Sequence, residues 1–304
     1  MAFFIDGHCD SAVLPNPQKL ITGSAGQLDF LRLTANHKAQ IFAFFLNERK
    51  YKAKLLEEML VKAALFKQIV NNCEFTDLLL KKSDLAKNKV LALMSLEGVE
   101  VLLGRPELAE IFFDIGFRAA GLTWNNDNWA AGGCGGNNSG LTEAGYVLIE
   151  KLNELDMIID LAHASPKTFR EVIKTSKKPV MVSHSCCFSL HEHRRNLTNE
   201  QLRLLAEKGG ICGINFYPEF LKGSTANIED IVEHIHHAVN IAGLEQVGLG
   251  SDFDGIDELP GGMNGVQDLP KLAEALSQKG YAEAAVAKIM GGNWYRFLRD
   301  NLPY

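Results

Sequence analysis

The sequence lacks several features that mark specialised classes of protein. No apolar run among the 304 residues approaches the roughly 18 residues that a membrane-spanning helix needs. The start of the chain has no basic segment followed by a long apolar stretch, so it shows no pattern of a secretory signal. The formal net charge of -6 argues against a nucleic-acid partner, because such partners are bound by basic surfaces. We therefore expect a cytoplasmic protein that binds neither membranes nor nucleic acids.

Cysteine is sparse, and two glycine-rich binding motifs are missing. The six cysteines, at positions 9, 73, 134, 186, 187 and 212, form no C-x-x-C pair of the kind that binds structural zinc. Without a secretory signal, reduced thiols are the expected state. No G-x-G-x-x-G follows the first apolar run, and the glycine-rich stretch 130–140 contains no G-K-[ST], so neither a dinucleotide site nor a phosphate loop is indicated. We interpret that stretch as a mobile surface loop.

The sequence does contain a regular alternation of apolar and amphipathic segments. The apolar runs are nearly continuous in apolar character, as expected of strands that are buried on both faces of a parallel sheet. There are eight of them: 3–6, 41–46, 90–96, 118–123, 157–161, 179–183, 210–216 and 246–251.

The segments between the apolar runs have the periodicity and the end signals of helices. Apolar residues recur at steps of three and four over 56–70. Ser165-Pro166 is typical of a helix start, Thr198 and Gln201 have the spacing of a capping box, and Asn227 can cap a further helix. Helices are also predicted at 268–279 and 282–300. Eight strand–helix units predict an α/β fold, a TIM-like (β/α)8 barrel forming one domain over 1–304, with a doubly wound open sheet as the alternative.

Polar residues follow the predicted strands at the end where barrel enzymes have their active sites. Five of the eight strands end in a histidine or a carboxylate, namely His8 and Asp10, Glu97, His163, His184, and Asp252. The other three end at Asn47, at Trp124-Asn125, and at Asn215 and Tyr217. Because all these ends meet at one rim, the pattern predicts a metal or acid–base site.

The number and type of these groups favour two metal ions. Imidazole and carboxylate ligands suit zinc and similar divalent ions. Six such groups exceed the three protein ligands of a single catalytic zinc, and a carboxylate such as Glu97 has two oxygens with which to bridge a metal pair. Such a pair can lower the pKa of bound water to about 7.

Other titratable residues are expected to lie outside this site. His234, His236 and His237 are predicted to be surface histidines, and His191 and His193 to be loop residues. Asp6 and Asp160 precede the histidines at the strand ends and are expected to be supporting or structural carboxylates. Cys9 lies between His8 and Asp10, so its side chain should point to the opposite face of the strand.

Several motifs in order give the chain a resemblance to a known family. The segments "DGHCD", "SLEGVE", "IIDLAHAS", "VSHS", "HRRNLT", "GINFY" and "VGLGSDFDG" resemble the membrane (renal) dipeptidase family of zinc peptidases, nearly from end to end. The resemblance implies that His8 and Asp10 hold one zinc, that Glu97 bridges, and that His163 and His184 hold the second zinc. It implies that Asp252 is the acid–base residue, and that Arg195 rather than the equally exposed Arg194 binds the substrate carboxylate.

One position departs from the family pattern. Where the family often has a histidine thought to stabilise the tetrahedral intermediate, this chain has Trp124 within "GLTWNNDN". An indole donates one hydrogen bond but cannot take a charge, so the metals, Asn125 or another donor would have to act instead, or the substrate range or rate differs. We assign Trp124, Asn125 and Tyr217, together with Arg195, to substrate binding.

The resemblance predicts a dipeptidase with two divalent metal ions, expected to be zinc, acting on short dipeptides and tolerating a D-residue at the second position. It also implies a homodimer. Two alternatives remain open. One is an amidohydrolase that acts on a non-peptide amide, lactam or lactone, and Trp124 keeps this alternative open. The other is a barrel that has lost catalysis and serves only for binding.

Overall fold

Eight parallel strands close into a ring. The computed structural model describes residues 3–16, 18–23, 26–33 and 36–304. Its strands are β1 (Phe4–Cys9), β2 (His37–Phe44), β3 (Thr76–Leu78), β4 (Val90–Glu97), β5 (Phe117–Gly121), β6 (Ile158–Asp160), β7 (Met181–Ser185), β8 (Ile211–Ile214) and β9 (Val247–Leu249). From β2 they follow in the order β1, β9, β8, β7, β6, β5 and β4, and pairing between β2 and β4 closes the ring. The predicted (β/α)8 barrel is confirmed, and the closure excludes an open sheet.

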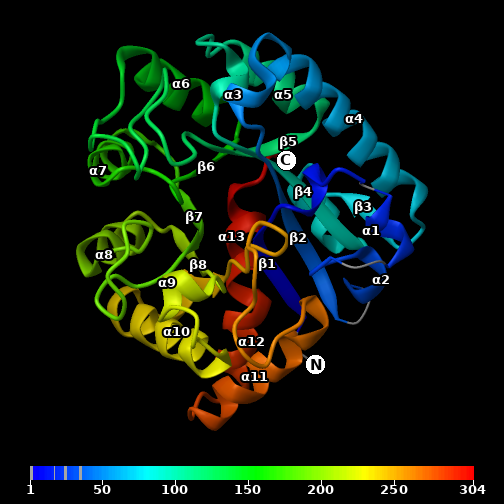
Figure 1. Cartoon of the computed structure of the whole chain (residues 1–304), viewed down its shortest axis with the longest axis vertical. Helices are drawn as coiled ribbons and strands as arrows, with labels where there is room; N and C mark the ends of the chain where they lie inside the picture. The colour runs from blue at the N-terminus through cyan, green and yellow to red at the C-terminus, as the bar shows by residue number, and fades with distance from the viewer. Residues whose placement is uncertain (1–2, 17, 24–25, 34–35) are drawn as a thin grey trace.

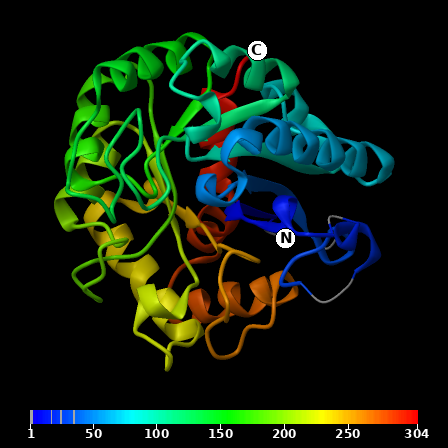
Figure 2. The same cartoon turned by 45° about the horizontal axis from the view of Figure 1, so that its top comes forward.

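Helices surround this ring and separate most successive strands (Figure 1). A second view shows the same outer layer with the strands inside it (Figure 2). The helices are α1 (Lys19–Thr22), α2 (Phe30–Leu33), α3 (Glu48–Tyr51), α4 (Leu55–Asn72), α5 (Leu108–Ile115), α6 (Glu143–Glu154), α7 (Pro166–Thr175), α8 (Asn199–Glu207), α9 (Pro218–Leu221), α10 (Ile228–Ala242), α11 (Leu269–Gln278), α12 (Glu283–Ala287) and α13 (Asn293–Asn301). Among the described residues, no helix has both the length and the apolar character that crossing a membrane requires.

The predicted helix starts are confirmed at three positions. Ser165 accepts a hydrogen bond from the backbone N–H of Thr168 at the start of α7. Thr198 forms a capping box at the start of α8, and Asn227 forms one at the start of α10. These caps satisfy backbone N–H groups that have no partner within the helix.

Several predicted boundaries differ from the observed ones. The first strand continues to Cys9 instead of ending at residue 6, and the second begins at His37 instead of residue 41. The predicted helix 282–300 is interrupted by a π-helical turn at Lys288–Gly292 between α12 and α13. β3 was not predicted. It is three residues long and pairs with the first half of β4, on the same edge of β4 that pairs with β5 in its second half.

The glycine-rich stretch 130–140 is only partly a surface loop. Its first residues, 130–133, are buried, and the exposed part is confined to residues 135–139. The carboxylate of Asp127 accepts hydrogen bonds from the N–H of Gly133 and the hydroxyl of Ser139, which fixes the shape of the loop. The prediction of an entirely surface-exposed loop was therefore wrong for residues 130–133.

The interior of the barrel is apolar at one end and polar at the other. Side chains from the first halves of the strands, such as Ile5, Ala39 and Leu91, form one buried cluster with Trp294 and Phe297 of α13. α13 therefore packs against the N-terminal end of the barrel. The indole N–H of Trp294 reaches into the interior and donates to the backbone oxygen of Leu249, the last residue of β9. The C-terminal ends of the strands remain available for the polar site.

Candidate metal centre

The six histidines and carboxylates predicted at the strand ends come together at the C-terminal mouth of the barrel. His8, Glu97 and His184 are 2%, 8% and 2% exposed. All of the six except His8 line a cavity of about 260 Å³. Binding cavities for drug-sized ligands measure about 300–1,000 Å³, so this one suits a small substrate.

One group of donor atoms surrounds Nε2 of His8. It lies 3.6 Å from Oδ1 of Asp10, 3.7 Å from Oε2 of Glu97 and 3.8 Å from Oδ1 of Asp252. Nε2 of His8 and Oδ1 of Asp10 are buried without a hydrogen-bond partner. Tetrahedral ligands at about 2.0–2.2 Å from a zinc ion lie about 3.4 Å from one another, so this spacing fits a metal ion that these orphaned atoms would share.

A second group of donor atoms surrounds Nε2 of His163. This atom lies 2.9 Å from Oε1 of Glu97 and 3.0 Å from Nε2 of His184. Nε2 of His184 lies 3.9 Å from the same oxygen of Glu97. Glu97 thus presents Oε2 to the first group and Oε1 to the second, so each group of donor atoms contains one oxygen of the same carboxylate.

His8 and His184 point into the barrel because their strands are irregular at these residues. Over residues 6–9, β1 advances three residues while β2 advances two, and the same mismatch occurs over residues 182–185 of β7 against β8. Strict alternation would place His8 on the helix-facing side with Phe4. An extra residue in a strand re-aims the side chains that follow it, and such bulges are frequent next to active sites.

Burial and charge set the protonation of the first group. Burial by itself lowers the pKa of His8, but the negative charges of Glu97, Asp10 and Asp252 raise it to about 10. Burial raises the pKa of Glu97 well above its usual range, and the negative charge of Asp10 adds to the effect. Without a metal ion, this group therefore holds protons that a bound cation would displace.

The two histidines of the second group are held neutral. Burial lowers the pKa of both well below the usual range, and the positive charges of Arg195 and His8 lower it further. A neutral imidazole is the form that ligates a metal ion. The second group therefore has the donor chemistry of a metal site.

Asp252 is held in place by its backbone and by Asn215. Its φ of 66° lies in the left-handed region, which costs a non-glycine residue free energy and is characteristic of functional positions. The side-chain amide of Asn215 donates to Oδ2 of Asp252 at 3.0 Å, which leaves Oδ1 facing His8. Burial raises the pKa of Asp252. A β-carbon at Gly255 would lie 2.5 Å from both Asp252 and Asp10, so only glycine fits beside these carboxylates.

Arg194 and Arg195 differ sharply in their exposure to solvent. Arg195 is 5% exposed, and its guanidinium donates to the backbone oxygens of Ala162 and His184 and lies 3.2 Å from Nε2 of His163. Arg194 is exposed on the rim of the same cavity. The expectation that the two are equally exposed was wrong, because the loop after β7 is tied down by a hydrogen bond from Ser185 to the Arg195 oxygen.

Trp124, Asn125 and Tyr217 also line the cavity. The Trp124 ring stacks on Phe45, with the ring centroids 4.8 Å apart. The side-chain oxygen of Asn125 accepts from Nδ1 of His163 at 3.0 Å and from the thiol of Cys134 at 3.3 Å. Asn125 therefore orients a donor of the second group, a contact that its position in the sequence did not predict.

The residues expected to lie outside the site mostly do so. Cys9 is buried in the helix-facing core, as predicted. His234 was predicted to be a surface residue but is 2% exposed, because its ring accepts from the N–H of Cys187 and donates to the oxygen of Leu221. His193 lines the cavity and packs on Phe220, so its assignment to the loop alone was incomplete.

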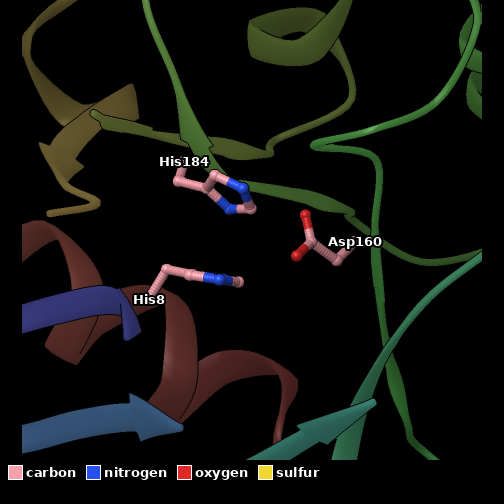
Figure 3. A group of neighbouring side chains, drawn as sticks. All are labelled: His8, Asp160 and His184. Carbon is pink, nitrogen blue, oxygen red and sulfur yellow. The ribbon is translucent and has the colours of Figure 1, made fainter. Parts of the chain in front are cut away.

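The two carboxylates that precede the strand-end histidines, Asp160 and Asp6, are both buried. Asp160 points toward the rings of His8 and His184 (Figure 3), and donor atoms of these three residues lie within 4.8 Å of one another. Asp6 accepts hydrogen bonds from the N–H and the hydroxyl of Ser251, which agrees with its expected supporting position.

Sequence comparison connects the chain with one peptidase family. The family described as membrane dipeptidase, peptidase family M19, matches residues 2–302. Dipeptidase aclJ of Aspergillus oryzae is 30% identical over 297 residues, which cover 90% of this chain and 70% of the relative. An uncharacterised dipeptidase of Schizosaccharomyces pombe is 36% identical over 221 residues, covering 71% of this chain. The match spans only about half, 54%, of the length of that yeast relative.

Solved structures have the same fold over nearly their whole length. A dipeptidase described as a metallopeptidase of family M19 superposes with a TM-score of 0.92 at 26% identity, covering 100% of this chain and 99% of its own. A metallopeptidase of Rhodobacter sphaeroides, solved with a phosphinate mimic of the dipeptide L-Ala-D-Ala, superposes with a TM-score of 0.90 at 25% identity, covering 99% of both chains.

Proposed function

The chain belongs to the membrane dipeptidase family, which includes a solved metallopeptidase, and from that membership we propose that it is a binuclear zinc dipeptidase. Its substrates are dipeptides, including those with a D-residue at the C-terminal position, as the ligand of the Rhodobacter relative suggests. The observation that carries the proposal is the position of the Glu97 carboxylate, which offers one oxygen to each of two groups of metal-binding atoms.

The residues divide the reaction between them. His8, Asp10 and Glu97 would hold one metal ion, and Glu97, His163 and His184 would hold the other. Bound divalent ions supply Lewis-acid polarisation of the scissile carbonyl and of the attacking water. Asp252 takes the proton of that water and returns it to the leaving amine, acting first as general base and then as general acid. Asn215 keeps the Asp252 carboxylate turned toward the site during both transfers.

Arg195 binds the carboxylate at the C-terminal end of the substrate. Its guanidinium is buried beside His163. A substrate carboxylate at this position would form a charge-assisted hydrogen-bonded pair with the guanidinium. Because this clamp requires a free carboxylate one residue beyond the scissile bond, it restricts the substrate to dipeptides.

We expect Arg195→Met to raise KM for a dipeptide by about 10–100-fold with a much smaller change in kcat, because hydrogen bonds to a charged group contribute about 1.5–3 kcal/mol. The matched control is Arg194→Met, which removes an exposed guanidinium from the rim of the same cavity. Steady-state kinetics on L-Ala-D-Ala measure both variants. A larger KM in Arg194→Met than in Arg195→Met would show that Arg194, and not Arg195, binds the substrate carboxylate.

Trp124 forms the wall that faces the amino-terminal residue of the substrate. The loop that carries Arg195 follows β7, which lies four strands from β2 in either direction around the ring, and Phe45 directly follows β2. The stacked pair begins beside the carboxylate clamp, at Trp124, whose ring centroid lies 6.1 Å from that of His163, the residue that Arg195 contacts. From there it extends to Phe45 at the end of β2, on the far side of the barrel mouth. Trp124 also lines a neighbouring hollow of about 110 Å³.

We expect Trp124→Ala to join this hollow to the substrate cavity and to favour larger amino-terminal residues. The ratio of kcat/KM for L-Leu-D-Ala to that for L-Ala-D-Ala should rise by about 10-fold or more, the range over which hydrophobic pockets discriminate side chains by size. Trp124→Phe keeps an aromatic wall and should keep the wild-type ratio. An equal loss on both substrates in Trp124→Ala would show that Trp124 does not set this preference.

A hydrolysis panel tests the proposed function directly. The purified protein, loaded in turn with zinc, manganese and cobalt, is assayed on L,L and L,D dipeptides and on lactones. Hydrolysis of dipeptides at a kcat/KM far above that for lactones supports the proposal. Preference for lactones would favour the non-peptide amidohydrolase, to which Trp124 points because it replaces the family's histidine. Less than about one metal ion per chain without activity would favour a binding barrel, since catalytic sites of this chemistry need bound metal.

A further inference from the structure

We propose that the hydroxyl of Ser183 positions one imidazole of each metal site and thereby couples the two sites. The inference rests on the metal centre of the proposed function, but it concerns a residue that contacts neither metal nor substrate in that scheme. Ser183 lies within β7, immediately before His184.

The Ser183 hydroxyl contacts the imidazole rings of two proposed metal ligands. Oγ of Ser183 lies 3.2 Å from Nδ1 of His8 and 2.8 Å from Nδ1 of His184. The Nε2 atoms of the same two rings face the metal-binding groups, His8 in the first and His184 in the second. One oxygen atom is therefore shared by ligands of both proposed metal ions.

The chemistry of imidazole makes this sharing consequential. A neutral imidazole that ligates a metal ion through Nε2 carries its proton on Nδ1. A hydroxyl oxygen has two lone pairs, so Oγ of Ser183 can accept from both Nδ1–H groups at once. This arrangement is compatible with the metal-binding tautomer of both rings at once and holds their orientation.

Asp160 holds the serine beneath the two rings. Its Oδ1 accepts the backbone N–H of Ser183 at 2.9 Å and that of Ala162 at 3.1 Å. Its carboxylate points toward the gap between His8 and His184 (Figure 3). The serine backbone is thus fixed by a buried carboxylate on the neighbouring strand β6.

Three glycines leave the space that this placement needs. A β-carbon at Gly7, Gly213 or Gly250 would lie 2.8, 2.1 or 2.1 Å from the backbone oxygen of Ser183, closer than real β-carbons approach. These glycines lie in β1, in β8 and directly after β9. The irregularity in β7 over residues 182–185 brings the backbone oxygen of Ser183 close to these strands. There is room for this oxygen only because the three facing residues are glycines.

Loss of the hydroxyl would leave two buried N–H groups without an acceptor. Such groups cost free energy, and the rings can relieve the cost by turning or by changing tautomer. Turning moves Nε2 away from its metal, and the change of tautomer places the proton on Nε2, so either response weakens metal binding. Outer partners of metal-ligating histidines typically contribute 10–100-fold in metal affinity. Because Ser183 serves both rings, both affinities should fall together.

The test is zinc titration of the metal-free full-length protein, followed by competition with a chromogenic chelator. In Ser183→Ala both zinc dissociation constants should rise by about 10–100-fold. Ser185→Ala is the matched control: it removes a buried hydroxyl from the same strand that donates to the Arg195 oxygen, and it should keep both constants near the wild-type values. Unchanged constants in Ser183→Ala, or a change at one site only, would overturn the proposal.

Two further measurements separate the role of Ser183 in metal binding from effects on folding and on hydrolysis. Thermal unfolding of the metal-free variants separates loss of metal affinity from loss of folding. Histidine ¹⁵N NMR of the zinc-loaded wild type needs no variant: His8 and His184 should both be protonated at Nδ1, and an unprotonated Nδ1 on either ring would overturn the proposal. None of these readouts uses hydrolysis, so a protein that binds two zinc ions but cleaves no dipeptide would defeat only the proposed function.

Discussion

Asp252→Asn is expected to abolish dipeptide hydrolysis while leaving the metal content at the wild-type level. The amide keeps the size of the carboxylate and can still contact Asn215, but it can neither take the proton of the attacking water nor return it to the leaving amine. General acid–base catalysis contributes about 10²–10⁴-fold, so kcat should fall by at least about 100-fold. Steady-state kinetics together with metal analysis of the same preparation measure both halves of the expectation.

Asp254→Asn is the control for this prediction. Asp254 lies two residues further on and also has a positive φ, but its carboxylate accepts from the Ser11 hydroxyl and the N–H of Gln27 rather than facing the cavity. Its replacement should affect stability more than turnover. Wild-type turnover in Asp252→Asn would remove Asp252 from the mechanism, and loss of metal from that variant would make it a ligand instead of a proton carrier.

The barrel could be predicted from the sequence because its strands are buried on both faces. Near-continuous apolar runs at a regular spacing, with caps such as Ser165 and Asn227 between them, indicate the order and type of the elements. The ends of the strands were less predictable. β2 begins at His37 because a buried histidine and Gln40 extend it beyond its apolar part. Polar residues inside a strand hide its start from any pattern based on hydrophobicity.

The candidate site was predicted as a set of residues but not as a geometry. Histidines and carboxylates at several strand ends point to the rim of the barrel, and the structure gathers all six there. Strict alternation along β1 would have turned His8 toward the helices, and only the pairing with β2 reveals the extra residue that turns it inward. Ser183 was missed because a serine inside an apolar strand carries no signal of its own. Its importance depends on His8, which lies 175 residues away in the chain.

Glu97→Gln is expected to disrupt both metal positions through a single substitution. In the structure the two oxygens of Glu97 serve different groups: Oε2 faces His8, and Oε1 faces His163 and His184. Glutamine keeps one oxygen and replaces the other with an NH₂ group, which donates hydrogen bonds and does not ligate a cation. If the proposed binuclear site is correct, metal content should fall from two ions per chain to at most one. Hydrolysis should fall by about 1,000-fold or more, because Lewis-acid stabilisation contributes several kcal/mol.

The control is Glu100→Gln, which changes a partly buried carboxylate three residues further along the chain. Glu100 accepts from the side chain of Asn128 at 3.0 Å and belongs to neither metal-binding group. Metal analysis and kinetics on both variants separate loss of the bridge from a general loss of negative charge near β4. Two tightly bound metal ions in Glu97→Gln would refute the bridge. One bound ion with wild-type turnover would show instead that a single metal suffices and that the second group of donors is not needed for the chemistry.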